Sequence, residues 1–310
     1  MHEYITRTMY YFGVHLLFAS IVCLAAWVVT SIPRVRATTK YCIWVATALN
    51  FIAPVGALFD KLWKSHLSWA TPLPMIGGPA ATITQGPSGI VLFAVWSVGA
   101  VLMLTRLCLR LRADRCENRG VLGPSALNPK AGFLVQGVPV KFAEGQETPA
   151  VGGLFRPYIS LPSEIDRVLS EDELTAVLMH EVKHARRRDN LIRLAYEIVL
   201  CTLWFHPLVW VAGSRLALYR ELSCDEPVIQ SARGLHLVSA LKKLSCPQEG
   251  LLLQATASSF LRDRLAMLTA RPQRRTVLAS ALLSAAFSVL LVGGILETVA
   301  HTACCFLTKK

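Results

Sequence analysis

Charged residues are scarce in this chain, at 17% of its 310 residues, whereas hydrophobic residues make up 53% and the mean hydropathy is +0.45. Soluble domains usually have about 25% charged residues, so the composition argues against a wholly soluble protein. Acidic residues are the rarer kind, with 20 Asp and Glu against 32 Lys and Arg. The basic residues gather at the ends of apolar runs, and no nucleic-acid recognition motif accompanies them. We therefore expect a membrane protein with no direct nucleic-acid partner.

Cysteine pairs with the Cys-x-x-Cys spacing are also absent among the nine cysteines, which argues against a structural zinc knuckle. Signals for cleavage are lacking as well, because the first apolar run is too long for a signal peptide and no small-residue site follows it. We therefore expect this first run to remain in the protein as a membrane span.

Four apolar runs are long enough to cross a bilayer, which takes about 20 residues each. They are Met9–Ile32, Tyr41–Phe59, Gly89–Leu107 and Val277–Leu296. Basic clusters lie between the first two runs, after the third and before the fourth, and the positive-inside rule places all three in the cytoplasm. The clusters are Arg34, Arg36 and Lys40; Arg106, Arg110, Arg112, Arg115 and Arg119; and Arg271, Arg274 and Arg275. The N-terminus is then expected outside.

This topology divides the chain into three parts. Residues 1–112 are expected to hold three transmembrane spans with a short extracellular loop near 60–88. Residues 113–275 form the cytoplasmic part, and residues 276–310 hold the fourth span and a short extracellular tail. The expected fold class is an α-helical membrane protein of four spans with an inserted α+β domain.

A metal-binding pattern lies within the cytoplasmic part, at His180-Glu181-Val182-Lys183-His184. On a helix, a spacing of four residues puts both imidazoles on one face, so both can bind one metal ion. Glu181 then lies beside the ion without binding it, where it can act as the catalytic base. The pattern is typical of zinc hydrolases, and the alternative is a helix with two surface histidines.

The chain before this pattern predicts a small sheet and a clear helix start. Phe133–Gln136, Val138–Phe142 and Tyr158–Leu161 are apolar runs punctuated by Gly and Pro, which indicates short strands. Ser170 and Glu173 have the spacing of a capping box at the start of the metal-binding helix. An edge strand of such a sheet can hold an extended peptide by main-chain hydrogen bonds, although an ordinary α+β domain would have similar strands.

A catalytic zinc needs a third protein ligand, which must come from a later segment. The candidate is Glu221, with Asp225 one helical turn further on the same face. We predict that Glu221 binds the ion and that Asp225 holds a ligand histidine. Cys224 is either a competing soft ligand or a packed helix residue, and Glu226 is expected at the surface.

The segment Leu191–Val211 is apolar enough to be read as a further span. A single crossing, however, would put His184 and Glu221 on opposite sides of the membrane, where they could not share a metal. Pro207 can end a helix and let the chain return to the same side. We therefore predict a membrane-associated helical hairpin near 191–213.

Three polar residues inside this hairpin need an explanation. Arg193 and Glu197 are four residues apart and are expected to pair with each other, which argues against simple exposure to lipid. His206 is expected to be structural rather than a fourth metal ligand. The sequence leaves open whether the hairpin enters the bilayer or lies at its surface.

Five short motifs follow one another along the chain: Pro157–Pro162, His180–Asn190, Trp204–Trp210, Glu221–Glu226 and Arg262–Leu265. This series resembles the BlaR/MecR-type membrane metallopeptidases, the sensor-transducers of inducible β-lactam resistance, over nearly the whole chain. The resemblance implies a gluzincin fold with zinc as the cofactor. It implies His180, His184 and Glu221 as zinc ligands, and Glu181 as general base and acid.

Members of that family relay a signal by cleaving a cytoplasmic transcriptional repressor, and some also cleave themselves. The resemblance thus implies a protein substrate, contact with membrane lipid and a place in the bacterial inner membrane. The antibiotic sensors carry an extracellular penicillin-binding domain with a Ser-x-x-Lys nucleophile after the fourth span. Because this sequence ends at Lys310, we expect it to lack that domain. The trigger would then come from a separate sensor subunit or from the loop near 60–88, and a homodimer is a further candidate assembly.

Three functions remain open at this stage. The first is a regulatory metallopeptidase that acts on a repressor, and the second is a membrane protease for quality control or protein processing. The third is a non-proteolytic signalling scaffold, against which the intact His180, Glu181, His184 and Glu221 argue, since a scaffold needs no general base. A transporter is disfavoured because the four spans contain almost no ionisable residues.

Overall fold

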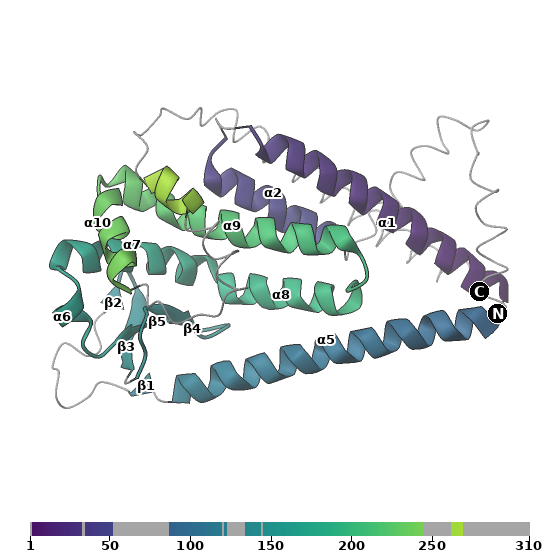
Figure 1. The fold of residues 1–310 in the computed structure, drawn as a ribbon, viewed down its shortest axis with the longest axis horizontal. Coiled ribbons are helices and arrows are strands. Elements are labelled where there is room, and N and C mark those ends of the chain that lie inside the picture. Colours follow the sequence, from purple (N-terminus) through teal and green to yellow (C-terminus); the bar gives the residue numbers. More distant parts are fainter. Residues whose placement is uncertain are drawn as a thin grey trace, which may run out of the picture.

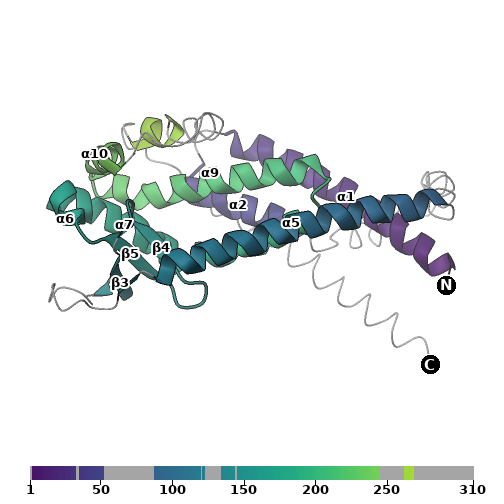
Figure 2. The same cartoon turned by 60° about the horizontal axis from the view of Figure 1, so that its bottom comes forward.

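The computed structural model of this chain describes residues 2–32, 35–51, 87–119, 121–122, 134–143, 145–244 and 262–268. Several helices run along the long axis of the molecule, and a small sheet with further helices lies at one end of them (Figures 1 and 2). The lengthwise helices are α1 (His2–Thr30), α2 (Ala37–Asn50), α5 (Pro87–Arg119), α8 (Asp189–Thr202) and α9 (Pro207–Gln230). At the sheet end lie α6 (Ile165–Val168), α7 (Glu171–Arg187) and α10 (Gly234–Leu244).

The sheet has five short strands in the order β1-β3-β5-β4, with β2 also paired to β3. The strands are β1 (Val121–Leu122), β2 (Leu134–Val135), β3 (Val138–Ala143), β4 (Ala150–Gly152) and β5 (Tyr158–Pro162). β3 and β5 run parallel, and the other pairs are antiparallel. The three predicted strands are confirmed as β2, β3 and β5. β1 and β4 were not predicted, because two or three residues are too few to show an alternating pattern.

α7 begins as the sequence predicts. Glu173 N donates to Ser170 Oγ, and Ser170 N donates to the Glu173 carboxylate at 2.8 Å, which together form a capping box. The inner face of α7 packs on the sheet, where Ala176 and Val177 share a core with β3 and β5. The helix ends at Arg187, and the left-handed backbone of the next residue, Arg188 (φ 57°, ψ 47°), leads directly into α8. The histidine-bearing helix is thus fixed at both ends and along one face.

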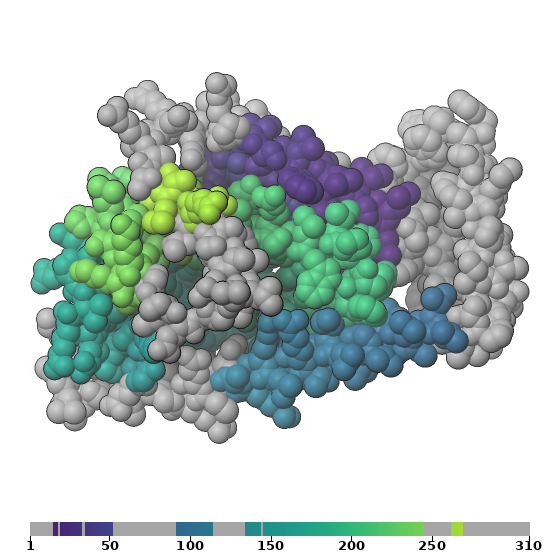
Figure 3. All heavy atoms as spheres, in the orientation of Figure 1, coloured from purple at the N-terminus to yellow at the C-terminus, as the bar shows by residue number. Residues whose placement is uncertain are grey.

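One helix of the described ranges, Val91–Ala113 within α5, is long and apolar enough to cross a membrane. Many of its large apolar side chains are exposed, and Phe93 and Leu102 are each 63% exposed, whereas Leu107 is buried. Figure 3 shows α5 lying along one side of the molecule next to α8 and α9. The first expected span corresponds to α1, and the second to α2, whose described part is 14 residues long. The fourth span at 277–296 and nearly all of the loop near 60–88 lie outside the described residues.

The chain reverses between α8 and α9, so that a helical hairpin occupies the predicted position (Figure 1). Tyr196 of α8 donates its hydroxyl to Val209 O of α9 at 2.7 Å. Gly213 permits this contact, since a Cβ at that position would collide with the Tyr196 ring. The reversal brings Glu221 back to the end of the molecule that holds α7. The relation of this hairpin to the bilayer remains a prediction.

The expected pairing of Arg193 with Glu197 is wrong. Glu197 instead lies 3.4 Å from Arg110 of α5. The hairpin and α5 meet at a second point, where Trp96 Nε1 of α5 donates to Thr202 O of α8. Glu197 therefore links the hairpin to α5, a long-range contact that spacing within one helix cannot reveal.

Glu226 is also not at the surface, contrary to expectation, because it is only 5% exposed. Its carboxylate accepts hydrogen bonds from the backbone N–H groups of Ala37 and Thr38 and from Thr38 Oγ1. These N–H groups open α2 and lack partners within that helix, so a carboxylate from α9 stabilises the start of α2. The Glu226 carboxylate, which was expected at the surface, thus joins α9 to α2.

Glu173 links the start of α7 to α10. Besides closing the capping box, its carboxylate accepts from Ser239 Oγ at 2.6 Å and from Lys243 Nζ at 2.7 Å. The hydrogen bonds from Lys243, Ser239 and Ser170 together lower the pKa of Glu173 from 4.5 to about 2. A carboxylate whose pKa is lowered by folding stabilises the folded state when it is ionised.

We predict that Glu173→Gln lowers the unfolding temperature of the chain. The difference in unfolding temperature between the variant and the unchanged chain should become smaller as pH falls. The carboxylate contributes its stability above the unfolded pKa of 4.5 and loses it as pH falls toward about 2. Thermal unfolding of detergent-purified protein at several pH values measures this difference. The exposed first-turn residue Glu171 provides the control Glu171→Gln. A difference that stays constant with pH would contradict the prediction.

Candidate metal centre

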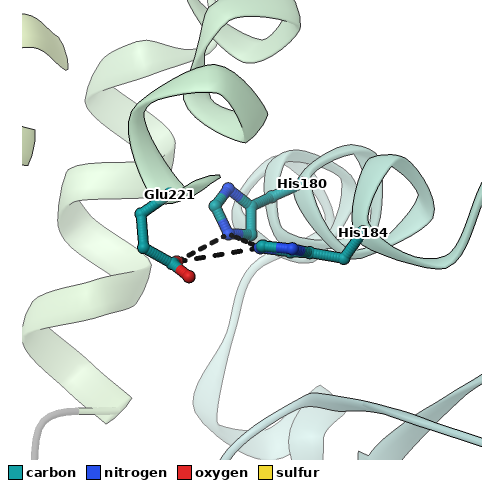
Figure 4. A group of neighbouring side chains, drawn as sticks. All are labelled: His180, His184 and Glu221. Carbon is teal, nitrogen blue, oxygen red and sulfur yellow. Dashed lines mark hydrogen bonds and ion pairs between the residues drawn. The ribbon is translucent and has the colours of Figure 1, made fainter. Parts of the chain in front are cut away.

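His180, His184 and Glu221 converge at the contact between α7 and α9 (Figure 4). The two Nε2 atoms are 3.1 Å apart, and Glu221 Oε2 lies 3.5 Å from His180 Nε2 and 3.7 Å from His184 Nε2. Zinc ligands at about 2.0–2.1 Å in tetrahedral geometry are separated by roughly 3.4 Å. The three donor atoms therefore form a triangle of the size that zinc requires.

The carboxylates behind the two imidazoles also fit a metal site, because histidines that bind metals usually have such a partner. His180 Nδ1 lies 2.9 Å from Asp225 Oδ1, and His184 Nδ1 lies 2.6 Å from Asp189 Oδ2. A carboxylate at Nδ1 favours the tautomer with the proton on that nitrogen, which leaves a lone pair on Nε2. Two Nε2 atoms at 3.1 Å can share a proton or can both bind a cation that lies beside them. The donor set thus matches a zinc ion bound by three protein ligands.

Asp225 supports the His180 side of the centre. It is fully buried, and its contact with His180 is short, although its direction is poor for a hydrogen bond. Arg264 donates from Nε and Nη2 to the two Asp225 oxygens, both at 3.0 Å. Burial acts to raise the pKa of Asp225, but His180 and Arg264 outweigh it and lower that pKa. The position of Asp225 agrees with its predicted place beside a histidine.

Asp189 supports the His184 side in the same way. Arg187 donates from Nε to Asp189 Oδ1 and from Nη2 to Oδ2, both at 2.6 Å. Burial opposes ionisation of Asp189, but the hydrogen bonds from His184 and Arg187 lower its pKa to about 2. Each histidine is therefore held by a carboxylate, and each carboxylate is held by an arginine.

Asp189, Arg187 and Arg264 also belong to the site, although they are not among the residues predicted from the sequence. Asp189 and Arg187 stand inside the quoted His180–Asn190 motif, so their proximity to His184 in sequence was an available signal. Arg264 comes from the segment 262–268, and its partner Asp225 lies 39 residues earlier, so spacing offered no signal.

Cys224 and His206 lie outside the donor triangle. Cys224 is fully buried, and its sulfur accepts from Arg187 Nη2 at 3.2 Å. It lies near His184 and Asp189 but outside the triangle of the three donor atoms. His206 lies against Ser20 and Phe51, which agrees with the expected structural role.

Glu181 follows the first histidine and faces the same charged groups. Burial raises the pKa of its carboxyl group, and the neighbouring His180 and His184 oppose that increase. Within the residues that the structure describes, no hydrogen bond or ion pair engages its carboxylate. A group in this state is available to take and return a proton.

Comparison with known proteins gives an independent result. The family model described as BlaR1 peptidase M56 matches residues 11–268, a range that contains every site residue named above. The regulatory protein BlaR1 of Bacillus licheniformis is 28% identical over 251 residues, which is 74% of this chain and 40% of that protein. The methicillin resistance mecR1 protein of Staphylococcus aureus is 22% identical over 143 residues, or 44% of this chain and 24% of that protein. The chain thus spans less than half the length of these relatives.

We predict about one zinc ion per chain in detergent-purified protein, and its loss in Glu221→Ala. The variant removes one corner of the donor triangle, so the two histidines alone should not retain the ion through dialysis. Elemental analysis measures the zinc content. Glu164→Ala, which changes an exposed glutamate on the sheet side, should keep full zinc. Full retention of zinc by Glu221→Ala would show that the third ligand is another residue.

Proposed function

Because this chain belongs to the BlaR1 peptidase M56 family, we propose that it is a membrane-embedded zinc metallopeptidase that hydrolyses a peptide bond in a cytoplasmic protein. The observation that supports this proposal most directly is the triangle of His180, His184 and Glu221, with a buried carboxylate behind each histidine. A helix with two surface histidines would have no need for these buried charges, which are costly to bury without partners. The arrangement favours the metallopeptidase over the signalling scaffold.

The residues divide the chemistry among them. His180, His184 and Glu221 would hold the zinc ion, which when bound supplies Lewis-acid chemistry, polarising the scissile carbonyl and activating a water molecule. Glu181 accepts the proton of the attacking water on its carboxylate and passes it to the leaving amine. Asp225 and Asp189 keep the imidazoles in the orientation and tautomer that direct Nε2 inward.

The sheet offers a place for the substrate backbone. β4 forms the end of the strand order and contacts α7, so an extended peptide added there would run beside the histidine-bearing helix. Asn190 Nδ2 donates to Val151 O of β4 at 2.7 Å, which fixes this edge strand relative to the start of α8, directly after α7. We place the substrate along β4 for these reasons.

We propose that the peptidase has a regulatory role in signal transduction. One relative is named a regulatory protein and another a methicillin resistance protein. We propose that the substrate is a cytoplasmic transcriptional repressor whose cleavage relays a signal, with self-cleavage as a companion reaction. A separate sensor subunit and a homodimer are the candidate assemblies for receiving that signal. Quality control or protein processing is the alternative class, and it predicts cleavage of many membrane proteins instead of one repressor.

The proposed topology has four spans that cross the inner membrane. It places the gluzincin domain 113–275 on the cytoplasmic side. α5 supports this topology. Arg106, Arg110 and Arg112 all lie in the second half of α5, toward the end of the helix that meets the sheet (Figure 1). Basic residues at the cytoplasmic end of a span are the usual arrangement. The catalytic residues would then lie close to the inner membrane surface.

We predict that Glu181→Gln abolishes peptide hydrolysis but retains zinc. The amide has nearly the same size but cannot accept the proton, so the rate should fall by about 10²- to 10⁴-fold. The measurement is cleavage of a transcriptional repressor co-expressed with this chain, followed by immunoblotting and N-terminal sequencing of the fragments. Glu164→Gln is the matched control. Cleavage by Glu181→Gln at the normal rate would rule out this role, and intact repressor with the unchanged chain would rule out this substrate.

We predict that alkaline phosphatase, which is active only outside the cytoplasm, is active when fused after Met75 and inactive when fused after Lys130. The first junction lies in the expected extracellular loop and the second in the expected cytoplasmic part. Phosphatase activity in intact bacteria, normalised to the amount of each fusion, measures the two orientations. The reverse pattern would invert the topology and place the metal centre outside the cytoplasm.

A further inference from the structure

The Asp189 carboxylate behind His184 has every acceptor position occupied. Oδ2 accepts from His184 Nδ1 and from Arg187 Nη2, while Oδ1 accepts from Arg187 Nε. The fourth donor is the hydroxyl of Tyr41, 3.0 Å from Oδ1. A carboxylate has about four lone-pair positions, so these donors together fix its orientation. Asp189 and Tyr41 are only 4% and 2% exposed, and water does not compete freely for these bonds.

Tyr41 differs from the other donors in its origin. His184 and Arg187 lie within five residues of Asp189, at the junction of α7 and α8, and they would move together with it. Tyr41 lies on α2, 148 residues away in sequence. Among the described residues, it is therefore the donor that fixes Asp189 relative to a separate part of the fold.

The position of α2 is itself fixed on the other side of the centre. Glu226, which accepts from the first N–H groups of α2, directly follows Asp225 on α9. Lys183, next to His184, donates both to Thr38 Oγ1 and to Ser223 O. The first turn of α2 thus lies at the contact of α7 with α9, beside both carboxylates that hold the histidines.

The Tyr41 ring has a second contact that holds it in place. The Arg187 guanidinium lies over the ring, 3.8 Å from its centroid, in a cation–π arrangement. Arg187 also donates to Arg220 O and to Ser223 Oγ on α9. Removal of the hydroxyl alone would therefore leave the ring packed and Arg187 in place, so that one hydrogen bond can be tested by itself.

We propose that Tyr41 is a positioning residue of the metal centre, which holds Asp189 and through it His184, so that the seating of α2 sets the affinity for zinc. This inference rests on the proposed zinc site at His180, His184 and Glu221. Without the hydroxyl, the Asp189 carboxylate can turn about its remaining donors, and the direction of the His184 lone pair is less strictly defined. Loss of groups that orient metal ligands typically weakens binding by about 10- to 100-fold.

The test is the zinc dissociation constant of the full chain in detergent, measured by competition with a chelator, for the unchanged chain and for Tyr41→Phe. We expect Tyr41→Phe to weaken zinc binding by about 10-fold or more. The visible absorption bands of the Co²⁺-substituted protein provide a second readout, since they respond to ligand orientation. These bands should shift in Tyr41→Phe.

Tyr219→Phe is the matched control. Tyr219 is also buried, donates its hydroxyl to Thr30 O at 3.2 Å and lies below the charge of Lys40. The hydrogen bond from the Tyr219 hydroxyl does not involve a metal ligand or a residue that orients one. Tyr219→Phe should therefore leave both the zinc dissociation constant and the Co²⁺ absorption bands unchanged. Equal effects of the two variants would show that Tyr41 acts only through general stability and would overturn the proposal.

A double variant tests the route through Asp189. If Tyr41 acts through that carboxylate, Tyr41→Phe combined with Asp189→Asn should bind zinc no more weakly than Asp189→Asn alone. The inference would be overturned if the two substitutions weakened zinc binding additively, or if the zinc dissociation constant of Tyr41→Phe lay within twofold of that of the unchanged chain. Either result would leave the zinc site intact. Failure of the unchanged chain to bind zinc would instead refute the proposed function, and this inference with it.

Discussion

The meeting of three donor atoms from two helices is the constraint on which the rest of this structure depends. His180 and His184 lie one turn apart on α7, so a single regular helix brings them together. Glu221 lies on α9 and reaches them only because the chain reverses between α8 and α9. The contact of Tyr196 with Val209, made possible by Gly213, keeps these two helices side by side. The hairpin is therefore part of the metal centre even though it supplies only one of its donors.

Four carboxylates, those of Glu181, Asp189, Glu221 and Asp225, are gathered around this centre, and their charges have to be balanced where water is largely excluded. An unpaired buried charge costs several kcal/mol, which would otherwise favour protonation of the carboxylates. Arg187 and Arg264 bind Asp189 and Asp225 through two nitrogens each, and Arg264 also approaches Glu221 at 3.6 Å. Arg264 belongs to the segment 262–268, so the centre is complete only when the chain beyond α10 is folded against it.

The metal centre is also joined to two of the lengthwise helices, α2 and α5. α2 is bound to α9 through Glu226 and to Asp189 through Tyr41, while α5 is bound to the hairpin through Arg110 and Glu197. A displacement of either helix would therefore strain contacts that lead to the donor triangle. Under the proposed function, such contacts would offer a physical route from the membrane spans to the metal centre.

The sequence by itself determined those features that arise from local geometry. Helical periodicity places His180, Glu181 and His184, and the capping box starts α7, because both depend on residues within four positions of each other. Glu221 and the hairpin could be inferred as well, since one ion needs a third ligand on the same side. Tertiary structure alone decided the roles of Glu226 and Arg264 and the attachment of Asp189 to Tyr41. Their partners are 39 to 189 residues away, and a charged or hydroxyl group in a sequence does not reveal which distant partner will neutralise it.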